Sequence, residues 1–426
     1  MGIARGVCTA TWLLFAALLV AGGPRVSAQQ PSNAGEADAM RPAREAERAG
    51  RFDEAFDGYL EAWHDPTFRV DAARRARAIE RIGRFSLGDD EEALEQLRRE
   101  LGPGFAAYRS KAFVVLSNAD DAWTRTRVTL LERARAQYFR EMDRLGIPVH
   151  PHRTRLVCVI FATHDEYVRH ARERDGFDAG WAAGYYGSER NVIVMYDDRS
   201  SPQLADAIQE LAIHEGRVDE LRLQATDAER AGGFDKARML RNAAAELDDQ
   251  IRDERTRIER AIGDFGVAKA IHEAIHLLAF NTGLQSRQRS YPVWVSEGLA
   301  SSFETASVNA AFGFMHPYEP RDRDLADAVL TGTLPAFREL VALETTQGVH
   351  AAGARPIYAA SYGLFRELYR TNRAQLQRYL IALADQPRGR LSPAQHVELF
   401  ERHFGAVEAL ERRLLRRWSV WAEQQQ

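Results

Sequence analysis

Cysteine is nearly absent from this 426-residue chain, which contains only Cys8 and Cys158. Cys8 lies in an N-terminal segment that we expect to be removed, so the mature chain keeps one cysteine and an intramolecular disulfide is excluded. Zinc sites closed by several cysteines are excluded for the same reason. Cys158 lies in an apolar, strand-like run and is expected to be a small buried hydrophobic residue.

Lysine is also scarce, because the basic residues other than Lys111, Lys236 and Lys269 are all arginines. Acidic residues outnumber basic ones by 61 to 57, which gives a net charge of −4. This balance predicts no nucleic-acid partner. The hydrophobic and charged fractions, 45% and 28%, are typical of a soluble globular protein. The length predicts two or three packed units.

Long apolar runs are absent outside the N-terminus. Arg5 precedes an apolar run over Trp12–Ala21, which is short for a bilayer span, and Val26-Ser27-Ala28 forms a small-residue cleavage site. We therefore predict a signal peptide over residues 1–28 and an exported protein, periplasmic or secreted, with no stable membrane span after cleavage. An uncleaved membrane anchor is the alternative. Residues 29–40 are small and polar and are predicted to be a disordered lead-in.

The remaining patterns predict a predominantly helical α+β fold. One pair of helices near Ala46–Ala55 resembles a tetratricopeptide unit, but a solenoid needs about three units, so a helical cap is favoured. Short apolar runs indicate a small sheet, and a three/four spacing indicates an inserted antiparallel helical hairpin. Both the cap and the hairpin are candidate surfaces for a protein partner. The predicted order is a cap (41–105), an α/β sheet (106–202), the hairpin (203–262), a zinc-site subdomain (263–380) and C-terminal helices (381–426).

The most informative stretch is Ala270-Ile-His-Glu-Ala-Ile-His276. On an α-helix, His272 and His276 project from one face, one turn apart, where they can share a zinc ion. Glu273 faces the same space and can accept a proton from water. A third ligand must come from a following segment, and Glu297 in Trp294-Val-Ser-Glu-Gly-Leu-Ala300 is the candidate.

These two motifs together resemble the gluzincin group of zincin metallopeptidases, and especially uncharacterised secreted bacterial peptidase-like domains with a WxxEGLA helix. The resemblance covers residues 110–200 and 265–370. It implies zinc bound by His272, His276 and Glu297, with Glu273 as general base. It also implies a zincin-like small mixed sheet, in which a hairpin over 183–196 supplies an edge strand beside the site. The helical hairpin at 203–262 departs from the family pattern.

Two further features of the resemblance concern groups around the metal. Gluzincins often carry a Tyr or His that stabilises the oxyanion, and Tyr362 is the first candidate for this role, with Tyr358 as the second. The alternative is that both tyrosines are core residues. Some relatives place an Asp one turn after the glutamate ligand to orient a histidine; here that position is Ser301, and Glu304 lies one turn later.

The sequence therefore predicts an exported zinc-dependent metallopeptidase that acts on peptides or proteins. The alternative is a non-catalytic, protease-like scaffold that binds zinc or a protein partner. A structural zinc site is usually closed by four protein ligands, often cysteines, and neither a cysteine nor a fourth histidine lies near the motif. This absence favours an open, catalytic site.

Overall fold

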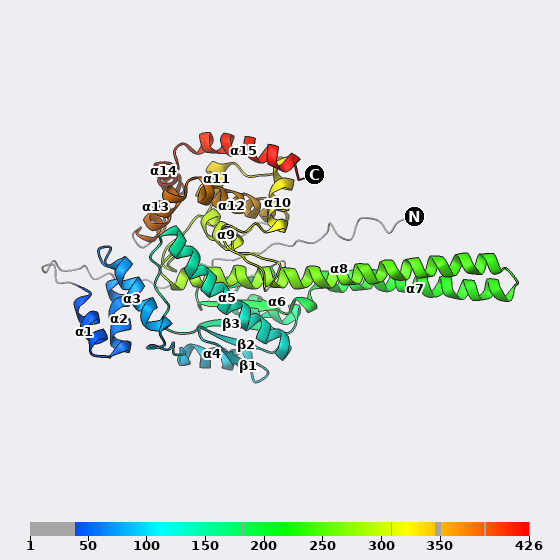
Figure 1. The fold of residues 1–426 in the computed structure, drawn as a ribbon, viewed down its shortest axis with the longest axis horizontal. Helices are drawn as coiled ribbons and strands as arrows, with labels where there is room; N and C mark the ends of the chain where they lie inside the picture. The colour runs from blue at the N-terminus through cyan, green and yellow to red at the C-terminus, as the bar shows by residue number, and fades with distance from the viewer. Residues whose placement is uncertain are drawn as a thin grey trace.

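The computed structural model describes residues 39–425, apart from 177, 181, 308, 346–350 and 387–388. The predicted signal peptide and nearly all of the predicted lead-in at 29–40 lie outside the described residues. The described part is predominantly helical with one five-stranded mixed sheet, which confirms the predicted α+β class (Figure 1). Among the described helices, none combines the length and apolar character needed to cross a membrane.

The sheet has the strand order β1-β2-β3-β5-β4. The three central strands run parallel to one another, and each edge strand is antiparallel to its neighbour. The predicted hairpin near 183–196 is confirmed as β4 and β5, with Gly184 opposite Met195. The strands are β1 (Ala106–Arg109), β2 (Phe113–Ser117), β3 (Leu156–Phe161), β4 (Gly184–Gly187) and β5 (Val192–Tyr196).

Both faces of the sheet are covered by helices, which explains why the central strands are apolar throughout. In β2, Phe113 and Val115 pack into the main core with α5 (Asp121–Leu145) and the C-terminal part of α8 (Phe234–Asn281). Val114 and Leu116 point to the opposite face, where α4 (Glu91–Leu101) and α6 (His164–Arg174) lie. The period-two alternation of strand side chains thus places α8 on one defined face.

The N-terminal cap contains the predicted helix pair, α1 (Arg41–Arg48) and α2 (Phe52–Ala62), followed by α3 (Arg69–Arg81). It is joined to the body by a buried ion pair in which both carboxylate oxygens of Glu80 on α3 accept hydrogen bonds from Arg135 on α5, at 2.7 and 2.8 Å. The cap is therefore fixed to α5 through a paired buried charge.

The predicted helical hairpin is confirmed: α7 (Pro202–Arg230) and α8 (Phe234–Asn281) pack side by side and project from the body (Figure 1). Its seam follows a seven-residue repeat and forms its own apolar cluster, separate from the main core. The boundary predicted between the hairpin (203–262) and the zinc-site subdomain (263–380) falls inside a continuous helix, because α8 is one helix of 48 residues. Gly263 and Gly266 weaken a helix by only about 1 kcal/mol each and do not break it here.

The C-terminal half packs around the end of α8. α9 lies against α8 and α12, and its side chains are buried along its whole length. The 3₁₀ turn η1 (Asp198–Ser200) follows β5 and also contacts α8. The helices are α9 (Val293–Ser301), α10 (Glu319–Leu330), α11 (Phe337–Ala342), α12 (Ala351–Thr371), α13 (Arg373–Ala384), α14 (Pro393–Phe404) and α15 (Val407–Glu423).

Candidate metal centre

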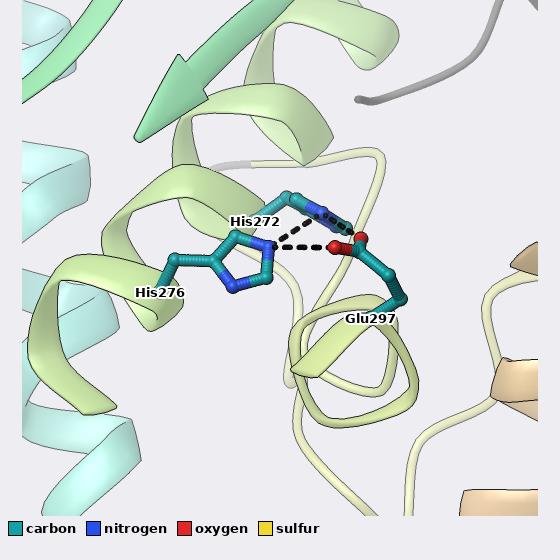
Figure 2. Close-up of side chains that lie close together, drawn as sticks. All are labelled: His272, His276 and Glu297. Carbon is teal, nitrogen blue, oxygen red and sulfur yellow. Dashed lines mark hydrogen bonds and ion pairs between the residues drawn. The ribbon is translucent and has the colours of Figure 1, made fainter. Parts of the chain in front are cut away.

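Three predicted ligands converge where α9 crosses α8. Nε2 of His272 lies 3.1 Å from Nε2 of His276 and 3.1 Å from Oε2 of Glu297. His276 Nε2 lies 3.6 Å from the other oxygen of Glu297 (Figure 2). All three side chains are buried, and one ligand atom from each lies within 4.8 Å of the others. The structure thus brings together the residues that the sequence selected.

The position of Glu297 follows from the packing of α9. The neighbouring Trp294 is fully buried and stacks on Tyr379, with ring centroids 5.5 Å apart. On the other side, Gly298 approaches α12 so closely that a Cβ there would lie 2.5 Å from the carbonyl oxygen of Ser361. The aromatic contact and the glycine contact fix the helix, so that Glu297 faces the two histidines.

The second nitrogen of His272 is also engaged. Nδ1 of His272 lies 2.8 Å from Oε1 of Glu304, and Arg321 donates to both oxygens of Glu304 at 2.8 Å. Such a carboxylate fixes the orientation of the ring and leaves Nε2 toward the ligand position. Of the two positions considered from the sequence, Glu304 provides this support, whereas the buried hydroxyl of Ser301 has no hydrogen-bond partner among the described residues.

The electrostatics of the cluster reflect its enclosure. Burial alone would lower the pKa of His272, but Glu297 and Glu304 raise it to about 9. Burial lowers the pKa of His276. Burial would raise the pKa of Glu297, but His276 and His272 lower it to about 2. A metal ion at these atoms would compete with protons for the imidazole nitrogens.

Glu273 lies beside the cluster without a hydrogen bond in the described part of the chain, and His272 and Lys269 are the nearby positive charges. Its side chain is fully buried, and neither carboxylate oxygen has a hydrogen-bond partner among the described residues. Burial raises its pKa to about 8. Leaving such a group unpaired is costly, and strongly perturbed groups of this kind cluster at functional sites. The two imidazole nitrogens and the carboxylate of Glu297 can hold a metal ion, and Glu273 lies beside them.

The edge strand predicted beside the site is β4. A Cβ on Gly184 would lie 3.3 Å from Cγ of Glu273 and 3.1 Å from the carbonyl oxygen of Val194. The glycine therefore allows the strand to approach the helix closely. The outer side of β4 has no strand partner in the described part of the chain.

The two candidate tyrosines differ in their surroundings. The hydroxyl of Tyr362 donates to Asp322 at 3.0 Å and accepts from Arg366 at 2.5 Å, so its hydrogen bonds are directed toward α10 and α12. Tyr358 instead packs in one cluster with Ala268 of α8, one turn before His272. The hydroxyl of Tyr362 is thus engaged with residues away from the cluster. Tyr358 lies against α8, the helix that carries His272 and His276.

The fold and site define an α+β protein with a buried His–His–Glu cluster that can hold a metal ion. Residues 266–387 match a family model described as "Protein of unknown function (DUF1570)". This segment begins within α8 and extends past α13, so it contains the three cluster residues, Glu304 and Arg321. It leaves out the sheet, α7 and the part of α8 before residue 266. No curated protein matches the chain.

Proposed function

We propose that this protein is an exported zinc-dependent metallopeptidase of gluzincin type, which hydrolyses peptide bonds in peptides or proteins. The observation that carries this proposal is the orphaned carboxylate of Glu273, fully buried beside the His272–His276–Glu297 cluster. A site that only bound a metal would need no further acidic group beside its three ligands. Burying such a group without a hydrogen-bond partner costs folding free energy. A hydrolase needs such a group as a base.

Zinc is the metal that this donor set suits best. Two imidazoles and one carboxylate, with a position left open, are typical of catalytic zinc sites in peptidases. Harder cations such as Mg²⁺ prefer oxygen ligands. When bound, zinc would polarise the substrate carbonyl and lower the pKa of a water molecule.

The residues of the chain would then perform separate tasks. Glu273 accepts a proton from the attacking water and delivers it to the leaving amine. Glu304 and Arg321 hold His272 in its ligand orientation. The open edge of β4 pairs with an extended substrate through main-chain hydrogen bonds. Tyr358, which packs beside Ala268, is a better candidate for oxyanion stabilisation than Tyr362, whose hydroxyl is engaged elsewhere.

The alternative function, a non-catalytic zinc-binding scaffold, is favoured by one observation. All three cluster residues and Glu273 are at most 3% exposed, so a substrate has little access to them in this conformation. In that case the cap or the helical hairpin would carry the interaction with a partner protein.

One set of variants decides between the two functions. Wild-type protein is expected to hold about one zinc and to cleave an unfolded protein substrate. Glu273→Gln should retain zinc and lose cleavage, His272→Ala should lose zinc, and Glu259→Gln, an exposed position on the same helix, should behave as wild type. If zinc-loaded wild type cleaves nothing across a broad peptide library, the protein is a non-catalytic scaffold and the peptidase proposal is wrong. If His272→Ala retains zinc, the site is wrongly assigned.

A further inference from the structure

A second buried charged cluster lies on α8, one turn before the candidate metal centre. Lys269 is fully buried, and its ammonium group donates to the backbone carbonyl of Tyr196 at 2.9 Å and to the carboxylate of Asp198. Asp198 is 2% exposed and also pairs with the buried Arg127 of α5 at 3.3 Å. Gly266 makes room for this arrangement, because a Cβ there would lie 2.0 Å from a carboxylate oxygen of Asp198.

From these contacts we propose that Lys269 is a positioning residue, which sets the placement of Glu273 against the substrate-binding edge strand β4. This inference rests on the proposed function. It assigns to Lys269 and Asp198 a role that is separate from metal binding.

The register of the sheet supports the assignment. Lys269 and Glu273 are four residues apart on α8, so both face the same side of the helix. Glu273 faces Gly184 of β4, and Gly184 pairs with Met195 of β5. The carbonyl that Lys269 binds belongs to Tyr196, the next residue of β5. The hydrogen bond from Lys269 therefore fixes α8 to the β4–β5 hairpin. It does so within one residue of the point where Glu273 meets β4.

The metal ligands are held from a different direction. His272 is oriented by Glu304 and Arg321, which come from the C-terminal half of the chain. Lys269 is instead held from the side of the sheet. Its partner Asp198 lies in η1 and also pairs with Arg127 of α5. Loss of one anchor should therefore leave the other in place, and the two can be separated by measurement.

Lys269 makes three contacts with its charged end. The ammonium group reaches a backbone carbonyl and a carboxylate at once, and it lies 4.4 Å from the centre of the Tyr196 ring. Lysine carries its charge on a compact head group at the end of a flexible stem, which suits these two contacts.

The test compares Lys269→Met with Glu304→Gln and with Lys236→Met, an exposed lysine on the helical hairpin that serves as control. In Lys269→Met, zinc affinity measured by chelator competition should stay within about threefold of wild type, while kcat falls ~10- to 100-fold with little change in KM. In Glu304→Gln, zinc affinity should fall ~10- to 100-fold. The control should match wild type in both.

Amide hydrogen exchange gives a readout that needs no activity. Exchange at residues 184–187 and 192–198 should rise in Lys269→Met and stay unchanged in Glu304→Gln. If circular dichroism shows that Lys269→Met does not fold, Lys269→Gln carries the same test, because its shorter side chain gives up the contact with the Tyr196 carbonyl while Asp198 keeps its pairing with Arg127.

Three results would overturn the inference: wild-type kcat in Lys269→Met, a parallel loss of zinc affinity and kcat in that variant, or unchanged exchange at β4 and β5. A wild-type protein that binds zinc but hydrolyses nothing would instead refute the proposed function. The exchange measurement would still decide whether Lys269 anchors the β4–β5 hairpin to α8.

Discussion

Gly298 and Ser361 are in direct contact across the α9–α12 interface: the carbonyl oxygen of Ser361 lies 2.5 Å from where a Cβ on Gly298 would stand. The glycine that follows Glu297 in the chain therefore determines how closely the helix carrying that ligand approaches α12. This contact gives a physical reason for the Glu-Gly pair of the motif.

Gly298→Ala is expected to push α9 away from α12 and to displace Glu297. Overpacking of this kind costs about 1–3 kcal/mol of unfolding free energy, and zinc affinity should fall with it. Denaturant unfolding and chelator competition measure the two effects. Gly216→Ala, the same change on α7 with no atom near the new Cβ, should be neutral or stabilising. Equal behaviour of the two variants would contradict the packing argument.

Glu80→Ala should destabilise the protein by about 3–5 kcal/mol, because it leaves the buried Arg135 without its carboxylate partner. Thermal unfolding measures the loss. Glu61→Ala, at an exposed position on α2, is the matched control and should change little. An unfolding temperature close to wild type for Glu80→Ala would show that this ion pair does not hold the cap to the body.

Acidification should destabilise the fold through His152. This side chain is 4% exposed, and its Nε2 accepts a hydrogen bond from Arg135 at 2.9 Å, so the ring is neutral. Burial, together with Arg135, lowers its pKa in the folded state to about 3, below the ordinary value of about 6.5. Between these two values the unfolded chain binds the extra proton, so stability is retained above about pH 6.5 and is lost as the pH falls through this window.

The expected contribution of His152 to the slope is about 1.4 kcal/mol per pH unit. His152→Gln offers a carbonyl acceptor in place of the ring nitrogen and should remove that contribution from stability measured between pH 6 and 4. His316→Gln, at an exposed position, should leave the slope unchanged. An unaltered slope in His152→Gln would mean that other groups govern acid unfolding.

The helical hairpin should tolerate shortening by whole heptads. Val218 and Ala244 lie in the seam cluster, which is separate from the main core. Removal of residues 218–224 and 238–244 takes one heptad from each arm and preserves the register, so the arms shorten by roughly 10 Å each. Zinc content and unfolding temperature should stay near wild type. Removal of only four residues from one arm breaks the register and should lower the stability of the hairpin.

Much of the site was predictable because helical periodicity relates sequence spacing to spatial proximity. His272 and His276 are separated by one helical turn, and Glu297 lies in a second apolar helix, so few arrangements of these residues were possible. The apolar runs of β2, β3 and β5 were equally clear, because buried parallel strands are apolar on both faces.

Other features depend on contacts that sequence spacing does not encode. The strand β1 was missed because most of its residues are exposed and its pattern has no buried face. Lys269 and Asp198 are 71 residues apart, so their pairing appears only in the fold. The surroundings of Tyr362 depend on Asp322, a residue of α10. The continuity of α8 does not follow from the spacing, because its first part packs in the hairpin seam and its last part in the main core. Gly266, within this helix, makes room for the carboxylate of Asp198.

The unbroken course of α8 has an electrostatic consequence for the site. His272 lies 38 residues after Phe234, so the positive end of the helix macrodipole is roughly 57 Å away. The negative end is near, because the helix ends at Asn281, five residues after His276. The peptide dipoles of α8 thus favour a cation at the site and give no support to the negative charge of Glu273. His272 and Lys269 instead supply the nearby positive charge that favours the ionised form of Glu273.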